Sequence, residues 1–307
     1  MLAAACGGEQ ARTAVVGRAP TTTTPAPTTT AAPARSDAKA VVTPSGVVVP
    51  VIAYEDTGTG QWRVRTPCNR TATIADGTPV AHVDIVLDPG HGGAEPGAIS
   101  PGGLREADVN LAVSQQAKAA LEAAGYTVVL TRTADYELGL LPRAEIARAI
   151  QPRAFVSVHH NAEPDGPRAG PGSETFYQIA SADSKRLAGL LYEEIVRALS
   201  SYDVAWVSDT DAGAKYRQGQ QGDYYAMLRR PGAVVSVLTE AAFVSNPPEA
   251  DLLARPDVQK VEGEALARAI VRYLTTADPG SGFTEGYPRT EPPDTSEPHV
   301  CQDPPLS

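Results

Sequence analysis

The sequence predicts an α/β fold in which helices flank a layered, mostly parallel sheet. Between residues 83 and 276, short apolar stretches alternate with longer amphipathic ones, as strands alternate with helices. The apolar stretches VDIVLD (83–88) and AVVSVLTE (233–240) show little polar alternation, which is typical of strands buried on both faces. Both patterns indicate helices packed on the two sides of one sheet.

The helices and strands follow from spacing and stop signals. Residues 105–124 place Val109, Val113, Ala117 and Leu121 on one helical side, and Gly125 follows as a stop signal. Further helices are expected over 140–150, 182–200, 247–254 and 256–275. Strands are expected over 83–88, 126–132, 154–161, 173–178 and 233–240. Since sites in such sheets gather at the carboxyl ends of strands, those ends are where functional residues are expected.

The segments outside this region have different compositions. Residues 1–43 include the Ala/Pro/Thr-rich stretch 19–36, which has too little apolar surface to fold and predicts a disordered linker. Residues 44–82 contain Val-rich and aromatic strand patterns around the turn DTGTG and predict a small β extension. Residues 277–307 are rich in Pro, Gly and acidic residues and predict a tail. The domain with the chemistry is therefore expected over 83–276.

The net charge and the N-terminal sequence limit the partners and the cellular location that we expect. The net charge is −10 and basic residues form no cluster, so we expect no nucleic-acid partner. The start MLAAAC followed by GGEQ resembles the end of a bacterial lipoprotein signal, which makes Cys6 a lipidation candidate and a lipid anchor the only expected link to a membrane. Chance in an Ala-rich sequence is the alternative. We expect an exported protein of the cell envelope, periplasmic or extracellular.

Cys68 and Cys301 flank the main domain. In an exported protein two such cysteines are candidates for a disulfide that ties the tail to the N-terminal strands. Two unpaired thiols remain the alternative, because sequence does not give their distance.

Three expected strand ends carry residues suited to metal chemistry. VDIVLDPGHGG supplies His91, FVSVHHNA supplies His159 and His160, and VVSVLTEAAF supplies Glu240. Glu106 stands where the first helix opens. Two histidines and one glutamate form a ligand set of catalytic zinc sites, with the fourth position left to water. Taken singly, a histidine after a strand is more often a hydrogen-bonded loop residue, and Glu106 could simply complement the helix dipole.

Several motifs resemble one family. VDIVLDPGHGGAEPGAIS, GGLREADVNLAV, GYTVVLTR, FVSVHHNA and VLTEAAFVSNPPEADLL resemble, in order, the zinc-dependent N-acetylmuramoyl-L-alanine amidases of bacterial cell walls. The resemblance runs over about residues 83–275. It implies a compact α/β hydrolase that binds Zn²⁺ and acts on peptidoglycan or muramyl peptides.

The resemblance also assigns residues. It implies that His91, Glu106 and His159 bind zinc and that Glu240 is catalytic. Neighbouring side chains of a strand point to opposite faces, so one site easily uses only one of the two adjacent histidines. The motif register selects His159. His160 stands where the family commonly has a small residue, and we expect it to serve packing or a hydrogen bond; support of a metal ligand from behind is the alternative.

The expected reaction is hydrolysis of the amide between the lactyl group of N-acetylmuramic acid and L-alanine of the stem peptide. Arg217, Asn161 and Asn246 lie near the motifs and are candidate substrate-binding residues; for Arg217 a solvated surface position is the alternative. Some relatives carry an insert that blocks the site until an activator binds. The interval between Asn161 and Val234 is too short for a large one, so we expect no activator requirement. A zinc peptidase that cuts within the stem peptide and an inactive wall-binding module are the alternative functions.

Overall fold

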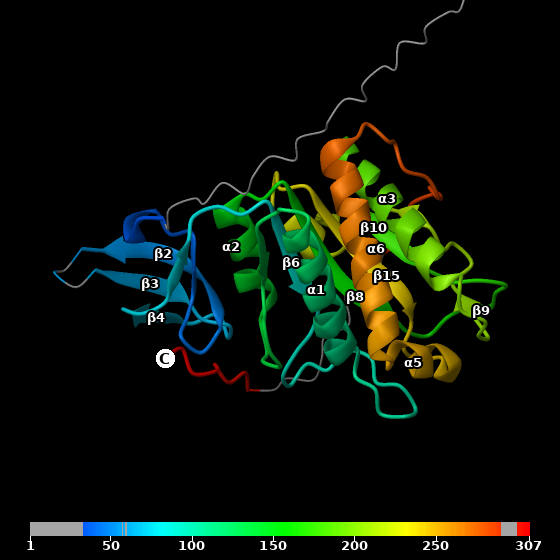
Figure 1. Cartoon of the computed structure of the whole chain (residues 1–307), viewed down its shortest axis with the longest axis horizontal. Helices are drawn as coiled ribbons and strands as arrows, with labels where there is room; N and C mark the ends of the chain where they lie inside the picture. The colour runs from blue at the N-terminus through cyan, green and yellow to red at the C-terminus, as the bar shows by residue number, and fades with distance from the viewer. Residues whose placement is uncertain (1–32, 57, 59, 290–299) are drawn as a thin grey trace, which may run out of the picture. The chain divides into compact units, whose positions relative to one another are not determined.

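The computed structural model describes residues 33–56, 58, 60–289 and 300–307, and Figure 1 shows their arrangement. Cys6 and the Ala/Pro/Thr-rich stretch up to residue 32 lie outside the described residues, so the lipidation and linker predictions are not addressed by the structure.

A six-stranded sheet forms the centre of the main domain. Its order is β12-β10-β15-β8-β6-β7. The neighbours β7, β6, β8 and β15 run parallel, whereas β10 is antiparallel to β15. The bounds of these strands are Ile85–Pro89 (β6), Val128–Leu130 (β7), Ala154–Asn161 (β8), Glu174–Tyr177 (β10), Ala214–Lys215 (β12) and Ser236–Phe243 (β15).

Helices cover both faces of this sheet, because its strands are apolar on both sides. Ile85 and Leu87 of β6 belong to the large apolar core on the side of α1, α3 and α6, while Val86 between them packs with residues of α2 on the other side. The helices are Glu106–Ala123 (α1), Leu140–Ile150 (α2), Ala182–Leu199 (α3), Ala226–Arg229 (α4), Pro247–Leu253 (α5) and Pro256–Thr275 (α6). Figure 1 shows α1 and α6 side by side in front of the sheet.

The N-terminal extension is a second sheet rather than one hairpin. Its five strands pair antiparallel in the order β4-β3-β2-β1-β5. They are Ala40–Val42 (β1), Val48–Glu55 (β2), Gln61–Arg65 (β3), Thr71–Ile74 (β4) and Thr78–Val80 (β5). The first strand begins before residue 44, in the range that the composition had assigned to the linker. Its three residues Ala-Val-Val were too short a signal beside a Thr/Pro-rich neighbour.

Residues 280–289 do not behave as a loose tail. The segment bridges to Ala214 through Phe283, and Tyr287–Pro288 (β16) pairs with Arg217–Gly219 (β13), which also pairs with Gly222–Asp223 (β14). Gly282 allows this close approach, since a Cβ there would lie 2.1 Å from the ring of Tyr192. The Pro and Gly content predicted a tail, although Phe283 and Tyr287 within it anchor the segment. Two short strands, Gly166–Pro167 (β9) and Val207–Ser208 (β11), pair elsewhere.

The C-terminal residues return to the N-terminal sheet. Cys301 forms a disulfide with Cys68, with their Cα atoms 5.6 Å apart. Beside it, Asp303 accepts hydrogen bonds from Thr66 Oγ1, the backbone N–H of Cys68 and Arg70. The end of the chain therefore closes onto the N-terminal extension by covalent and polar contacts.

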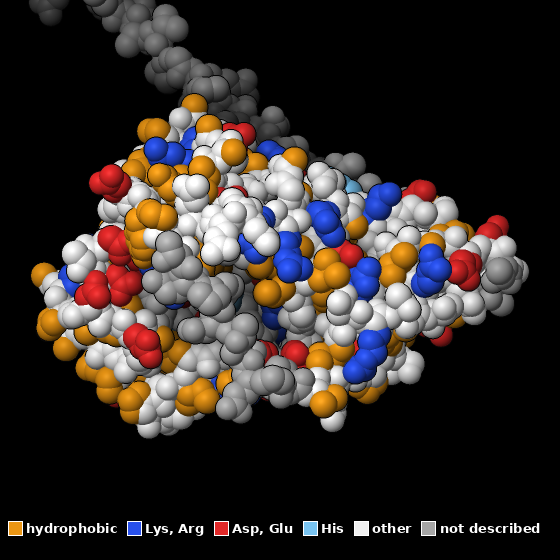
Figure 2. All heavy atoms as spheres, turned by 180° about the vertical axis from the view of Figure 1, so that it is seen from behind, with side chains coloured by type: hydrophobic (Ala, Val, Ile, Leu, Met, Phe, Trp, Pro, Cys, Tyr) orange, Lys and Arg blue, Asp and Glu red, His pale blue; other side chains and the backbone are white. Residues whose placement is uncertain are grey.

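The α/β class predicted from the sequence is confirmed. The expectation of a mostly parallel arrangement is not, because β10 reverses direction in the main sheet and the N-terminal sheet is antiparallel throughout. In the described part of the chain, no helix combines the length and the apolar character needed to cross a membrane. Figure 2 shows the face behind, where acidic side chains gather toward one side and basic ones toward the side of the N-terminal sheet.

Replacing Cys68 and Cys301 together with Ser should lower the free energy of unfolding by about 2–5 kcal/mol, because the disulfide restricts the unfolded chain over a separation of 233 residues. Denaturation can be followed through Trp62, which is buried in β3, in a Trp206→Phe background that leaves it as the only tryptophan. Equal denaturation midpoints with and without the cysteines would contradict a stabilising link.

Candidate metal centre

The loop after β6 presents His91 in an uncommon backbone conformation. His91 has φ +60°, in the left-handed region that non-glycine residues rarely adopt. Two arginines hold the loop. Arg143 of α2 donates to the carbonyls of Pro89 (2.7 Å) and His91 (2.6 Å). Arg132, after β7, donates to the carbonyls of Pro89 (3.0 Å) and Gly90 (2.9 Å). The strained backbone is thus fixed by buried donors from two other elements.

Asp88 explains why Arg143 can be buried. Its carboxylate lies 2.8 Å from Arg143 Nη1 and accepts hydrogen bonds from Thr131 and Ser157. Burial would raise the pKa of Asp88, but Arg143 and the hydroxyl donors hold it below its ordinary value. From the sequence, Asp88 could have oriented a histidine ligand or shaped the turn. Its hydrogen-bond partners are Arg143, Thr131 and Ser157, so it shapes the loop.

The Glu106 carboxylate is the shared neighbour of His91 and His159. It opens α1 and is only 4% exposed. Its Oε2 lies 3.3 Å from His91 Nε2, and its Oε1 lies 3.0 Å from His159 Nδ1. Burial alone would raise the pKa of Glu106, but hydrogen bonds and charge interactions with His159 and His91 hold it well below its ordinary range. The carboxylate is therefore ionised at neutral pH.

His159 approaches from the end of β8. Its ring stacks edge-on to that of His91 with centroids 4.9 Å apart. Burial lowers the pKa of His159 below its ordinary value despite the contact with Glu106. Glycine at two positions makes room for these rings. A Cβ on Gly90 would lie 2.2 Å from the His159 ring, and one on Gly97 would lie 2.4 Å from Glu106 Oε2.

The three side chains fit a divalent transition metal. One ligand atom each from His91, Glu106 and His159 lies within 4.8 Å of the others. An ionised carboxylate beside an imidazole whose neutral form is favoured is the protonation state that zinc ligation requires. Two imidazoles and one carboxylate form the donor set of open catalytic zinc sites. The chemistry of the donors thus agrees with a zinc centre.

Glu240 stands next to this cluster. It lies on β15 directly opposite His159 of β8 in the parallel pairing. Its Oε2 is buried and has no hydrogen-bond partner among the described residues. Burial raises the pKa of Glu240 well above its ordinary value, and the carboxylates of Glu106 and Glu174 raise it further, while Arg217 opposes them. A half-buried acid whose inner oxygen lacks a partner, beside possible metal ligands, is suited to proton transfer.

Comparison with known proteins identifies the family. A family model described as N-acetylmuramoyl-L-alanine amidase matches residues 85–272, which is more than half of the chain. The chain belongs to this amidase family. The N-terminal sheet and the segment after α6 lie outside the matched range.

Two relatives that are named as amidases support this family membership. The chain is 30% identical over 213 residues to the germination-specific N-acetylmuramoyl-L-alanine amidase of Bacillus subtilis, covering 64% of this chain and 82% of the relative. It is 30% identical over 224 residues to the amidase AmiC of Neisseria meningitidis, covering 63% of this chain but only 53% of that relative. The present chain thus spans about half the length of AmiC.

Solved structures share the fold. The amidase AmiC2 of Nostoc punctiforme superimposes with a TM-score of 0.52 and 31% identity, covering 62% of this chain and 96% of that one. The CwlD amidase of Clostridioides difficile, solved in complex with the GerS lipoprotein, gives a TM-score of 0.51 and 30% identity over 62% of this chain and 98% of that one.

Arg217 of the amidase domain is buried rather than solvated. It is 8% exposed, donates to the hydroxyl of Tyr225 and lies over the rings of Phe176 and Tyr287. Its Nη2 is 3.9 Å from Glu174, and its buried Nε has no partner among the described residues. The surface alternative is therefore wrong for this arginine.

The two asparagines differ in their surroundings. Asn161 donates to Glu174 at 2.6 Å, and Glu174 also pairs with the buried Lys215. Because Glu174 lies opposite Glu240 on β10, Asn161 belongs to the surroundings of the candidate centre. Asn246 instead donates to the carbonyl of Ala205 and to Glu249, which engages its amide in holding the start of α5. The structure thus brings Asn161 and Arg217 to the site, but gives Asn246 a structural task.

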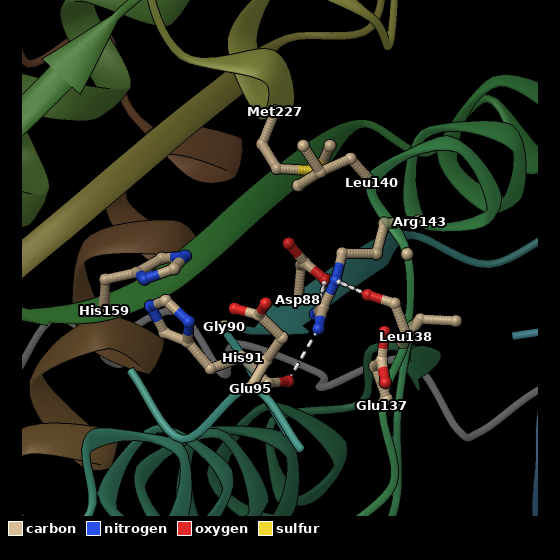
Figure 3. A pocket seen from close by; sticks show the side chains of 11 residues that line it. Asp88, Gly90, His91, Glu95, Glu137, Leu138, Leu140, Arg143, His159 and Met227 are labelled. Atoms are coloured by element: carbon tan, nitrogen blue, oxygen red, sulfur yellow. Dashed lines mark hydrogen bonds and ion pairs between the residues drawn. The ribbon is translucent and has the colours of Figure 1, made fainter. Parts of the chain in front are cut away.

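A pocket of about 320 Å³ opens beside the two histidines. Figure 3 shows His91 and His159 at one end, the Asp88–Arg143 pair in the middle and Leu140 and Met227 at the far end. The pocket runs from the candidate centre toward α2.

The sequence did not predict the buried Arg132 and Arg143, which hold the His91 loop, or the buried Glu262 of α6. A signal existed for two of them. Arg143 shares a helical side with Ile146 and Ile150, and Glu262 stands between Val258 and Leu266 at intervals of four. A charged residue within an apolar stripe needs a buried partner. Arg132 gave no comparable signal after its short strand.

The metal-free Glu240→Gln variant should be more stable than the native protein at pH 7, by about 1–3 kcal/mol, because it lacks a buried carboxyl without a partner. The folded pKa of Glu240 is raised, so the native form binds more protons than the unfolded form above pH 4.5, and native stability falls as pH rises from there toward the folded pKa. Near pH 4 the difference in the free energy of unfolding between the variant and the native protein should vanish.

Thermal melts of both proteins in chelator at several pH values measure this. Glu285→Gln, on an exposed carboxyl, is the control and should change little. A native protein that is the more stable at pH 7 would contradict the described environment of Glu240.

Proposed function

We propose that this chain hydrolyses the amide between the lactyl group of N-acetylmuramic acid and L-alanine of peptidoglycan stem peptides, with a zinc ion as cofactor. The observation that supports this most is the convergence of His91, Glu106 and His159 next to the half-buried Glu240, in a member of the amidase family. Such hydrolysis remodels the bacterial cell wall.

His91, Glu106 and His159 would hold the ion. A zinc ion bound there supplies a Lewis acid that favours ionisation of a water and polarises the amide carbonyl. His91 is kept in place by its strained loop and Arg143, and Glu106 by its position in the first turn of α1. Since these supports are buried, the ligands are preorganised before substrate arrives.

Glu240 is the proposed catalytic base and acid. Its raised pKa means that the carboxylate is a stronger base than an exposed glutamate, so it takes a proton from the attacking water more readily. The protonated acid then delivers that proton to the departing amine of L-alanine. Glu106, with its lowered pKa, keeps its charge at the same pH.

Arg217 and Asn161 are proposed substrate-binding residues. Arg217 keeps 8% of its surface exposed, and its guanidinium is the proposed partner of a carbonyl or carboxylate of the stem peptide. Asn161 lies at the end of β8, two residues after His159. Asn246 is not carried into this proposal, because its amide holds the start of α5, whereas that of Asn161 contacts Glu174 opposite Glu240.

The proposed place of action is the cell envelope outside the cytoplasm. The pairing of Cys68 with Cys301 supports this, because disulfides persist in oxidising compartments. Anchoring through a lipid on Cys6 remains part of the proposal and rests on the sequence alone.

Product analysis tests the reaction. Digestion of purified peptidoglycan should release intact stem peptides with a free L-alanine amine and leave unsubstituted glycan, as read by mass spectrometry. Chelator should stop the reaction. Glu240→Gln should lower turnover by about 10²- to 10⁴-fold while it retains zinc, since it removes proton transfer and no ligand.

Other products would favour the alternatives. Shortened stem peptides indicate a zinc peptidase, and retained binding without products indicates a wall-binding module. Either outcome contradicts the proposed bond specificity.

The purified chain should act without an added protein. Between Asn161 and Val234 the described elements are short strands, α3 and α4, and the packing of α3 against β10 and β15 supports this proposal. One related amidase was solved in complex with a lipoprotein, so this expectation needs its own assay. Release of stem peptides by the isolated chain supports it; activity only after addition of envelope extract contradicts it.

A further inference from the structure

His160 is buried beside the candidate centre and does not line the pocket. It is 2% exposed and lies between α1 and α6. Its Nδ1 is 2.8 Å from Asn110 Oδ1, and its Nε2 is 3.1 Å from Glu262 Oε2. The proposed function gives none of these three residues a role.

Asn110 connects this pair to the centre. Its amide nitrogen donates to Glu106 Oε1 at 3.1 Å and to the carbonyl of Gly90 at 3.3 Å. Both acceptors are carbonyl or carboxylate oxygens, so the NH₂ group must face them and Oδ1 must face His160. His160 Nδ1 therefore carries the hydrogen, which fixes the orientation of the amide. Without that donor, the amide could turn its oxygen toward the Glu106 carboxylate.

Glu262 fixes the ring in turn. Its side chain and that of His160 have no exposed surface, and its Oε1 has no hydrogen-bond partner among the described residues. Burying such a pair costs free energy that a well-packed apolar pair would not. The cost is explained if the pair determines where a neighbouring ligand points.

We infer that Glu262, His160 and Asn110 form a hydrogen-bonded network that positions the Glu106 carboxylate and so sets the affinity of the three-ligand site for its metal ion. The inference rests on the metal site of the proposed function. The three are positioning residues, because they act through Glu106. The backbone N–H of His160 adds a second constraint, since it donates to Glu106 Oε1 at 3.2 Å.

Zinc affinity of the purified full chain, measured by competition with a chromophoric chelator, tests the network. His160→Leu should raise the dissociation constant about 10- to 100-fold, the usual effect of losing an outer partner of a metal ligand. His159→Ala removes a ligand itself and should lose zinc altogether. The same assay on Glu262→Leu, which leaves His160 Nε2 without its partner, should give a loss like that of His160→Leu.

Two further variants separate positioning from general stability. Glu262→Gln can donate its amide to Nε2 of a ring that keeps hydrogen on Nδ1, so it should restore an affinity within about threefold of the native protein, since the hydrogen-bond pattern is retained. Leu266→Ala, one turn along the same helix and buried in the apolar core, should lower the melting temperature without changing zinc affinity.

The outcomes distinguish the two proposals. Native zinc affinity in folded His160→Leu or Glu262→Leu protein overturns the network. An equal loss of affinity in Leu266→Ala also overturns it, because the effect would then follow stability. If the native protein binds no zinc, the metal site of the proposed function fails first.

Discussion

The contact on which the rest of the site depends is that between the buried Glu106 carboxylate and the two imidazoles of His91 and His159. A carboxylate that is only 4% exposed must have donors or cations around it. The histidines provide these from two strand ends, β6 and β8, which adjacent parallel pairing brings together. The glycine-rich loop, the arginines that hold it and the start of α1 all keep this contact in place.

The same environment separates the roles of the neighbouring carboxylates. Glu106 has imidazole partners and a lowered pKa, whereas Glu240 has no hydrogen bond to its Oε2 and a raised pKa. Glu174, opposite Glu240, is compensated by Lys215. Groups of one type whose surroundings push their pKa values apart are typical of sites that divide ligand and acid–base tasks. The pairing order of β10, β15 and β8 places Glu174, Glu240 and His159 in one row.

Much of the fold could be predicted because the signals are local. The helix expected over 105–124 is found at Glu106–Ala123, and that expected over 140–150 begins and ends as predicted. The first strand and residues 280–289 were missed, since their stability comes from pairing with distant segments. The reversed direction of β10 could not be read either, because the apolar pattern of a strand does not state its direction.

The residues of the site also fall into two groups, those that local motifs predicted and those whose contacts join distant segments. His91, Glu106 and His159 were found by their motifs, and the structure brings them together. The contacts that hold them join residues far apart in sequence, such as Arg143 with His91 and His160 with Glu262. No pattern within one segment predicts such pairs. Only Arg143 on the apolar side of α2 and Glu262 on that of α6 indicated that buried partners must exist.

The most direct measurement of the metal centre is X-ray absorption at the zinc edge of the loaded protein. We expect one zinc per chain, with two imidazole nitrogens and carboxylate oxygen among its ligands at about 2.0–2.2 Å. The Glu106→Ala variant should lose this signal. A zinc with sulfur ligands, or an unchanged spectrum in that variant, would contradict a centre built on Glu106.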